Sequence, residues 1–221
     1  MSAGKARRHI LGSVILCKSL SLGVISLVGL VSLETLISGA KSGRLVSFPT
    51  DTVPALAVRP DRRSDIFTLK QRSPDKPLIL MAASWQEFLP FIDTKHPALP
   101  TWQQISQTYF PGAVTLVLPA SDRGCNLNQG FTTLGIRIPD SKTAIAILRQ
   151  TGAMLTTSAN KSNEPPLRKM IEIDAVFPNV MTLGDGINIS ELSGSGLPST
   201  VVEWNQDGWL IRRQGAVQFN F

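Results

Sequence analysis

The sequence predicts one α/β domain, with a twisted sheet of mixed and parallel strands flanked by helices. Short apolar runs of strand length alternate with amphipathic stretches of helical spacing along most of the 221 residues, a pattern typical of α/β folds. The last two strand-like runs flank a turn at residues 205–208, so we expect the sheet to close with an antiparallel hairpin and its pairing to be mixed. The length suits one large domain or two small ones, and the absence of an internal repeat or linker favours one.

The composition is that of a folded protein with a basic balance of charge. Hydrophobic residues make up 43% of the chain and charged residues 17%, which excludes a disordered chain. The formal charge of +6 favours polyanionic partners, such as nucleotides or RNA, without choosing among them. Cys17 and Cys125 fit free thiols in a reducing compartment, so we expect a cytoplasmic protein. Only His9 and His96 accompany them, and we expect no metal held by protein ligands.

A long apolar run, residues 10–33, follows the basic residues at the N-terminus. It resembles a signal peptide or a membrane anchor. Lys18 divides the run, however, and the run continues directly into a predicted domain helix capped by Ser32. We therefore predict an apolar N-terminal extension over 1–30 and a domain over 31–221, with peripheral membrane attachment as an alternative.

A short polar stretch, Thr50-Asp51-Thr52, follows the first well-marked strand, residues 44–48. Strand ends are where open α/β sheets place their ligand sites. We expect Asp61 to cap the next helix, which would present Lys70 and Arg72 at its C-terminal end. Two cations separated by one residue suit an anion with several oxygens, such as a polyphosphate. Taken alone, such a pair is more often a solvated basic turn.

Capping residues and strand-forming composition predict the remaining elements. Helices are predicted over 33–40, 85–89, 102–110, 142–151 and 171–177, three of them capped by Ser32, Ser84 and Ser141. Strands are predicted over 76–81, 114–118, 134–138, 154–157, 199–204 and 209–212. Residues 121–133 and 184–198 are predicted to be loops, the second of them near a ligand.

A series of short motifs occurs in a fixed order along the chain. They are Pro49-Thr50-Asp51-Thr52-Val53, Lys70-Gln71-Arg72-Ser73-Pro74, Lys76-Pro77-Leu78, Pro111-Gly112-Ala113-Val114-Thr115-Leu116-Val117-Leu118, Gly135-Ile136-Arg137-Ile138-Pro139, Ser158-Ala159-Asn160-Lys161-Ser162, Ser199-Thr200-Val201-Val202 and Arg213-Gln214-Gly215-Ala216. Each motif alone is weakly specific, but their order is very specific. The chain closely resembles the YrdC-like family, the threonylcarbamoyl-AMP synthases, over residues 31–217, in the short form that has no additional C-terminal domain.

The resemblance implies a YrdC-like fold with a concave basic face, and a reaction. Such enzymes make threonylcarbamoyl-adenylate and pyrophosphate from L-threonine, bicarbonate or CO2, and ATP. A separate transferase complex then moves the threonylcarbamoyl group onto the adenosine next to the anticodon of tRNA. The resemblance therefore implies a cytoplasmic nucleotidyltransferase whose ATP is accompanied by Mg²⁺ and which could contact tRNA or double-stranded RNA.

The resemblance also assigns roles to individual residues. The implied catalytic residues are Lys70, Arg72, Ser158 and Asn160. The implied ATP-binding residues are Arg72, Lys76, Thr115, Ser158, Asn160 and Arg213. The implied threonine-binding residues are Thr50, Thr52, Thr156 and Ser199. Arg212 is expected to face away from the site, because neighbouring residues of a strand point to opposite sides.

Two features leave the details of the site open. Arg137 lies in a matching motif, and ligand contact is about as well supported as a structural pair with a carboxylate such as Asp140. The chain also departs from the family pattern: Pro54-Ala55 replaces the usual Tyr-Gly, Asn163 replaces a glycine, and Gln214 replaces a proline. Asn163 suits the same turn because asparagine tolerates a left-handed backbone.

Other functions are compatible with the same residues. A non-catalytic module that binds tRNA or double-stranded RNA would explain the basic charge, although aromatic residues, at 6%, are few for a reader of single strands. A carbamoyl-adenylate enzyme with another acceptor, or one that uses carbamoyl phosphate, would keep the ATP residues and change the pocket near Thr52.

Overall fold

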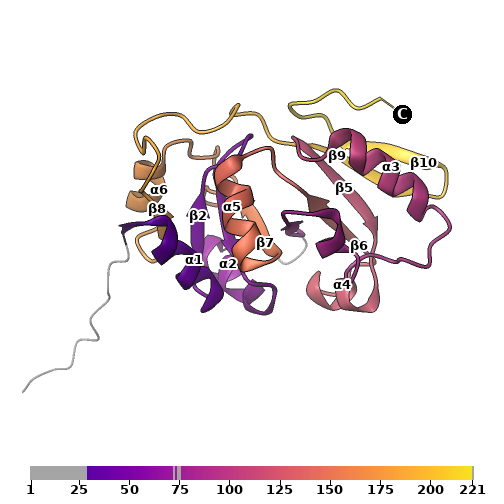
Figure 1. Ribbon diagram of the computed structural model, residues 1–221, viewed down its shortest axis with the longest axis horizontal. Coiled ribbons are helices and arrows are strands. Elements are labelled where there is room, and N and C mark those ends of the chain that lie inside the picture. The colour runs from indigo at the N-terminus through magenta and orange to yellow at the C-terminus, as the bar shows by residue number, and fades with distance from the viewer. Residues whose placement is uncertain (1–28, 72, 74–75, 221) are drawn as a thin grey trace, which may run out of the picture.

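The computed structural model describes residues 29–71, 73 and 76–220. Expectations for residues 1–28 and for Arg72 lie outside the described residues. In the described part, ten strands form one sheet in the order β1-β8-β2-β3-β7-β4-β6-β5-β9-β10 (Figure 1). The strands are β1 (Leu30–Val31), β2 (Val46–Phe48), β3 (Ala55–Val58), β4 (Ile79–Met81), β5 (Val114–Pro119), β6 (Thr133–Arg137), β7 (Met154–Ser158), β8 (Met181–Leu183), β9 (Thr200–Asn205) and β10 (Gly208–Arg213).

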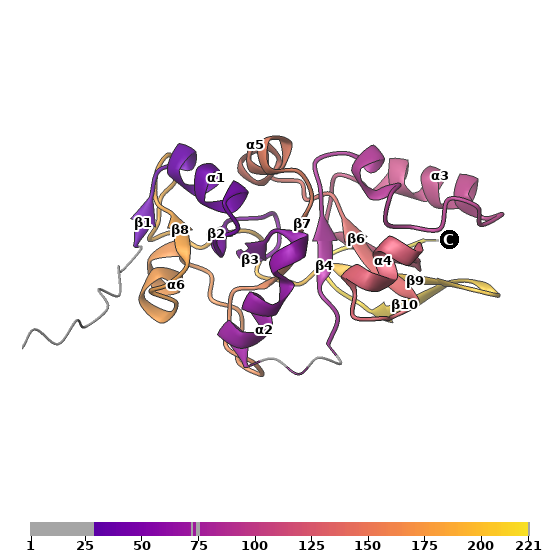
Figure 2. The same ribbon diagram turned by 90° about the horizontal axis from the view of Figure 1, so that it is seen from below.

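The pairing of the strands is mixed, as the sequence predicts. Parallel pairs are β1–β8, β2–β8, β4–β6 and β5–β9, and the remaining neighbours pair antiparallel. The helices are α1 (Leu33–Lys41), α2 (Arg63–Lys70), α3 (Leu99–Tyr109), α4 (Asp122–Leu127), α5 (Lys142–Thr151) and α6 (Met170–Val176), with 3-10 turns η1 (Pro60–Arg62) and η2 (Trp85–Phe88). Figure 2 shows α1, α5 and α3 on one side of the sheet and α2 and α6 on the other.

Two apolar clusters hold the layers together. One lies around β2, β3 and β8 with α1, α5 and α6, and includes the buried Leu36, Phe48 and Ile147. The other lies around β4, β5 and β6 with α3, and includes the fully buried Trp102 and Leu116. Burial of side chains of this size stabilises the fold by about 1.5–3 kcal/mol each.

Two of the four predicted N-terminal caps are confirmed and two are wrong. The side chains of Ser32 and Ser141 accept hydrogen bonds from backbone N–H groups at the starts of α1 and α5. Asp61 does not cap α2; its carboxylate binds the guanidinium of Arg59 instead. Ser84 precedes η2 without capping it, because its hydroxyl binds the carboxylate of Glu87.

Some elements of the fold have no clear signal in the sequence. Residues 121–133 are not all loop: Ser121 caps α4, whose sequence is too polar and glycine-rich to suggest a helix. The short strands β1, β3 and β8 were not predicted. The β3 sequence is Ala-Leu-Ala-Val, and alanine is a weak strand former, so the fully buried position between β2 and β7 decides its structure.

Aromatic packing fixes the β9–β10 hairpin against α3. The ring centroids of Trp204 and Trp209 lie 5.2 Å apart in an edge-to-face arrangement, and Trp204 also packs edge-to-face against Trp102 of α3. Tyr109 stacks on Phe219 at 4.6 Å. Contacts of this kind contribute about 0.5–1.5 kcal/mol beyond the buried area. They hold the hairpin that carries Arg213 at its end.

Candidate active site

A cavity of about 560 Å³ lies between strands from both halves of the sheet. Its volume is within the usual range for a small-molecule site. Its lining brings together residues predicted as site residues on separate segments, namely Thr52, Thr115, Thr156, Ser158, Asn160, Ser199 and Arg213. Arg137, Pro54 and Ala55 line the same cavity.

Three predicted residues lie elsewhere. Thr50 is buried beneath Thr52 rather than at the cavity wall, and Lys70 is buried behind the end of β7. Lys76 is exposed, and its ammonium donates to the side-chain oxygen of Asn163 at 3.1 Å. Asn163 has the left-handed backbone expected of it, with φ of 67°.

Hydrogen bonds in the Thr50-Asp51-Thr52 loop fix the direction of its hydroxyl groups. Thr50 Oγ1 lies 2.7 Å from the carbonyl oxygen of Val53, which can only accept, so Thr50 donates there. The hydroxyl of Thr52, 3.1 Å away, must then donate to Thr50. Thr52 Oγ1 also accepts from Arg137 Nη1 at 2.9 Å. The remaining lone pair of Thr52 can therefore only accept a hydrogen bond from a group in the cavity.

Arg137 is the centre of the buried polar network below the cavity. Its side chain is 3% exposed, and Nη2 lies 2.6 Å from Asp51 Oδ1. Its Nε donates to the carbonyl oxygen of Gly112 at 3.0 Å. The carboxylate partner expected from sequence, Asp140, is wrong, and Asp51 takes that place. Burial lowers the pKa of Arg137, while the charge of Asp51 and its hydrogen bond oppose that shift.

Lys70 organises the turn after β7. Its ammonium donates to the carbonyl oxygen of Ser158 at 2.6 Å and to Asn160 Oδ1 at 3.0 Å. Asn160 Oδ1 also accepts from the hydroxyl of Ser158, and its amide nitrogen donates to the carbonyl oxygens of Lys161 and Glu164. The amide of Asn160 is thus fully occupied within the turn. Lys70 and Asn160 hold the hydroxyl of Ser158 at the cavity wall.

The opposite wall joins β5, β9 and β10. The hydroxyls of Thr115 and Ser199 lie 2.8 Å apart, and Arg213 donates to the carbonyl oxygen of Ser199 at 2.9 Å. Burial lowers the pKa of Arg213. Arg212 binds Glu203 instead, as its opposite orientation on the strand predicts, although the register of β10 shifts between Ile211 and Arg213.

A segment of the predicted loop 184–198 crosses the Thr50–Thr52 loop at close range. The backbone N–H groups of Ser195 and Gly196 donate to the carbonyl oxygens of Asp51 and Thr52, both at 2.9 Å. Residues 184–198 contain no helix or strand, as predicted, and Gly196 and Pro198 line the cavity; that the loop contacts a ligand stays a prediction. Gly194 has φ of +64°, and a Cβ there would lie 2.3 Å from the carbonyl oxygen of Thr52.

Substitution of Gly194 by alanine should therefore destabilise the protein more than the same substitution at Gly186. Gly186 is the matched control, because its φ is +71° but nothing lies within 4 Å of a Cβ. Gly186→Ala should cost about 1–2 kcal/mol for the left-handed backbone alone. We expect Gly194→Ala to lower the free energy of unfolding by about 2 kcal/mol more, since overpacking adds to the strain. Urea denaturation measures both, and equal losses would contradict the close crossing.

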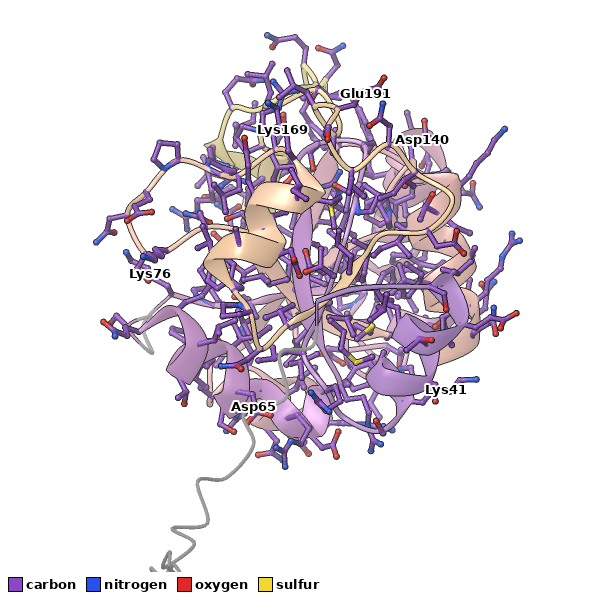
Figure 3. The ribbon with its side chains drawn as sticks, turned by 90° about the vertical axis from the view of Figure 1, so that its left-hand side faces the viewer. Lys41, Asp65, Lys76, Asp140, Lys169 and Glu191 are labelled. Atoms are coloured by element: carbon purple, nitrogen blue, oxygen red, sulfur yellow. The ribbon has the colours of Figure 1, made fainter. Side chains whose placement is uncertain are left out.

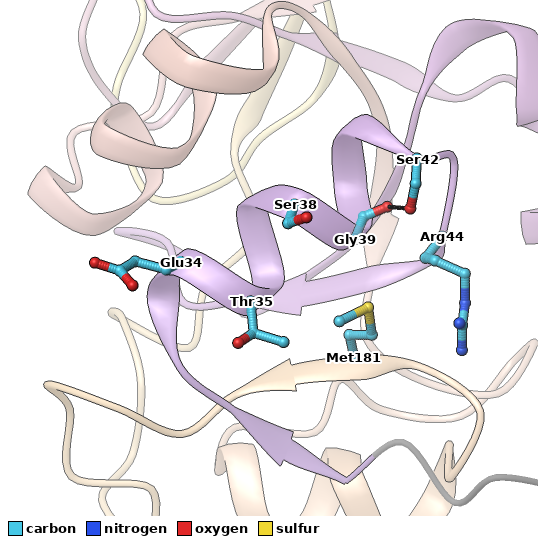
Figure 4. A pocket seen from close by; sticks show the side chains of 7 residues that line it. All are labelled: Glu34, Thr35, Ser38, Gly39, Ser42, Arg44 and Met181. Atoms are coloured by element: carbon cyan, nitrogen blue, oxygen red, sulfur yellow. Dashed lines mark hydrogen bonds between the residues drawn. The ribbon is translucent and has the colours of Figure 1, made fainter.

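A second hollow lies beside α1. It is an open depression lined by residues of α1, its C-terminal turn and β8, and Figure 4 shows Glu34, Thr35, Ser38 and Arg44 around it. The hydroxyl of Ser42 donates to the carbonyl oxygen of Gly39 at 2.8 Å at its edge. It contains none of the predicted site residues, and its wall is made by the packing of Met181 on Gly39.

Neither the charged surface near α6 nor any metal-binding group among the described residues adds a residue to the candidate site. Figure 3 shows that the side of the molecule near α6 carries charges of both signs, among them Lys41, Asp65, Lys76, Asp140, Lys169 and Glu191. Over residues 29–71, 73 and 76–220 there is no group of three or more His, Cys, Asp or Glu side chains arranged to hold a metal ion. In the same residues, no helix has both the length and the apolar character needed to cross a membrane.

The family model described as "Telomere recombination", which is that of Sua5, YciO and YrdC proteins, matches residues 39–215. The chain belongs to the Sua5/YciO/YrdC family. This confirms the resemblance inferred from the ordered motifs. The match includes the strands that line the cavity.

This Sua5/YciO/YrdC chain has relatives named threonylcarbamoyl-AMP synthase. It is 31% identical to that of Vibrio campbellii over 176 residues, 76% of this chain and 91% of the relative. It is 31% identical to that of Pasteurella multocida over 172 residues, 73% of this chain and 93% of the relative. These identities extend over most of each relative, so the likeness is not confined to one motif.

Solved structures share the fold. P. abyssi Sua5 complexed with L-threonine has a TM-score of 0.74 and 24% identity, and the match covers 83% of this chain and 54% of that one. E. coli YciO has a TM-score of 0.69 and 20% identity, over 84% of this chain and 90% of that one. At these identities the likeness establishes the single-domain α/β fold with a mixed sheet.

Proposed function

We propose that this chain is a threonylcarbamoyl-AMP synthase, which makes threonylcarbamoyl-adenylate and pyrophosphate from L-threonine, bicarbonate or CO2, and ATP. The observation that carries the proposal is the cavity itself. Residues as far apart in sequence as Thr52, Thr115, Ser158 and Arg213 line one space of about 560 Å³. The names of the relatives and the threonine complex of P. abyssi Sua5 support the same reading.

The chemistry requires a site that tolerates two anions. The threonine amine adds to CO2 and loses a proton, which gives a carbamate. A carbamate oxygen then bonds to the α-phosphorus of ATP while the bond to the β-phosphate bridging oxygen breaks and pyrophosphate leaves. Cations and fixed donors must offset the repulsion and the charge on the leaving group. We assign this role to the cations Arg72, Lys76 and Arg213. The hydroxyl of Ser158 gives its proton to Asn160 Oδ1, so toward a ligand in the cavity it can only accept a hydrogen bond.

We assign the other predicted site residues to positioning the substrates and the groups that contact them. Lys70 and Asn160 shape the turn that presents Ser158, as their mutual hydrogen bonds support. Thr52, which is held by Thr50, offers an acceptor to the hydroxyl or amine of threonine. Thr156 and Ser199 line the same cavity, and we assign them to the threonine pocket. We find no side chain that must act as a general base, so orientation of the reactants supplies much of the rate.

The substrates and the product of this reaction indicate which ion and which partner enzyme accompany it. ATP would enter with Mg²⁺ held mainly by phosphate oxygens and water, as this ion prefers. Threonylcarbamoyl-AMP would pass to a separate transferase that modifies the adenosine beside the anticodon of tRNA, which places the work in the cytoplasm. We propose residues 31–221 as the catalytic domain and residues 1–30 as an extension outside it.

Pyrophosphate release tests the proposal directly. With ATP, Mg²⁺, bicarbonate and L-threonine, the purified full chain should release pyrophosphate, and omission of any one component should reduce release to background. Product analysis by mass spectrometry should show threonylcarbamoyl-adenylate. If another amino acid or carbamoyl phosphate supports release better than threonine, the Pro54-Ala55 wall of the cavity serves a different acceptor. Absence of release in every mixture, with RNA binding retained, would support a binding module instead.

A further inference from the structure

The far end of the cavity is lined by Asn128 and Thr133, which have no role in the assignments above. Asn128 is the residue that ends α4, and it is 4% exposed. Its position is fixed from two directions. Its backbone N–H donates to the carbonyl oxygen of Gly124 at 2.9 Å, and Arg63 of α2 donates to the carbonyl oxygen of Leu127, the preceding residue, at 2.9 Å.

The amide of Asn128 has a defined orientation. Its Nδ2 donates to the backbone carbonyl oxygen of Thr133 at 2.7 Å. A carbonyl oxygen can only accept, so the atom at this position must be the nitrogen, and the side-chain oxygen must be the other atom. No described residue donates a hydrogen bond to Asn128 Oδ1. Asn128 thus brings an unused acceptor to the cavity wall.

The length of β6 separates the end of the cavity near Asn128 from the end near Thr52, where we place threonine. Thr133, Gly135 and Arg137 alternate along β6, line the cavity together and therefore share one face. At about 3.3 Å per residue, Thr133 and Arg137 are about 13 Å apart. Asn128 is bound to Thr133 and Arg137 orients Thr52, so Asn128 and the predicted threonine pocket lie toward opposite ends of this face of β6.

Between the two ends, the lining includes a glycine and aliphatic side chains. Gly135 is paired with Ile79 of β4 on one side and with Val117 of β5 on the other, and all of them line the cavity. Gly135 has no side chain, and a Cβ there would make an ordinary contact with Thr115 Cγ2 at 3.4 Å, so the strand carries only backbone at this point of the lining. A planar apolar ring can lie against this part of the lining with its polar edge toward Asn128.

We propose that Asn128 recognises the exocyclic amino group of the nucleobase and so selects adenine over guanine. The proposal rests on the proposed function, because it takes a nucleoside triphosphate as the second substrate. An adenine amino group would donate to Asn128 Oδ1. Guanine and hypoxanthine carry an oxo group in the same place, and two acceptors would then face each other without a proton between them. The residue acts on specificity and takes no part in bond making.

Nucleotides that lack the amino group test the proposal. Purine riboside triphosphate is ATP without the 6-amino group, and one hydrogen bond is worth about 0.5–1.5 kcal/mol. The wild-type chain should therefore use it with a kcat/KM about 2- to 12-fold lower than that for ATP. In Asn128→Ala the two nucleotides should be used equally well. If Asn128 only supports the loop, the variant will slow both reactions and keep the wild-type ratio, which would overturn the proposal.

Binding to the wild-type chain provides a second measurement that needs no variant, in case Asn128→Ala does not fold. Calorimetric titration should give an affinity for AMP above that for purine riboside monophosphate, with IMP and GMP weakest. Equal affinities for the four nucleotides would refute base recognition. The same titration separates the two proposals: selective AMP binding without pyrophosphate release would remove the synthase function and leave the role of Asn128 standing.

Discussion

Replacement of Arg137 by leucine should lower the free energy of unfolding by about 3–5 kcal/mol. The change leaves Asp51, whose side chain is 15% exposed, without the guanidinium that lies 2.6 Å from it. It also removes the donor to Thr52 and the bond to the carbonyl oxygen of Gly112. Removal of one partner of a buried ion pair costs more than the pair contributes, because a charge stays buried and uncompensated. Urea denaturation of the purified variants measures the loss.

The double variant Asp51→Asn with Arg137→Leu separates charge from packing. Without the carboxylate, no charge is left unpaired at this position, so the double variant should be more stable than Arg137→Leu alone. Its threonine KM should still be raised, because Thr52 has lost the donor that fixes the direction of its hydroxyl. A double variant that is less stable than the single variant would show that the cost does not come from the carboxylate.

Many residues that line the cavity could be predicted from the sequence, but their hydrogen-bond partners could not. Thr52, Ser158 and Arg213 lie at strand ends or in ordered motifs, and such signals are local. The partner of Arg137 is Asp51, 86 residues away in sequence, and only the strand order brings them together. Asp140 lies close to Arg137 in sequence, but closeness in sequence does not identify the carboxylate that pairs with this buried arginine.

The role that we propose for Asn128 could not be predicted from the sequence for a similar reason. Two glycines and several polar residues in its segment predict a loop, yet Ser121 accepts a hydrogen bond from the backbone of Gly124 and starts a short helix. A serine three residues before that N–H was the available signal. The orientation of the Asn128 amide depends on Thr133 of a different element, which no local pattern contains.

Replacement of Lys70 by methionine should reduce kcat/KM about 100-fold, a loss of about 2.7 kcal/mol in transition-state stabilisation. Methionine is close to lysine in length but removes the charge. The carbonyl oxygen of Ser158 and the side-chain oxygen of Asn160, 2.6 and 3.0 Å from the ammonium, then lose a charged donor. The turn that places the Ser158 hydroxyl should relax, and small displacements of positioned groups are costly to rate.

Lys41→Met is the matched control, because Lys41 is exposed at the last turn of α1 and lies outside the cavity. It removes the same charge from the protein and should leave the rate unchanged. Asn160→Ala should reproduce most of the Lys70→Met defect, and the double variant should add little to it, because the two residues act on one turn. Additive losses would show instead that Lys70 acts directly on the phosphates. The comparison therefore decides whether this buried cation works through the protein or on the substrate.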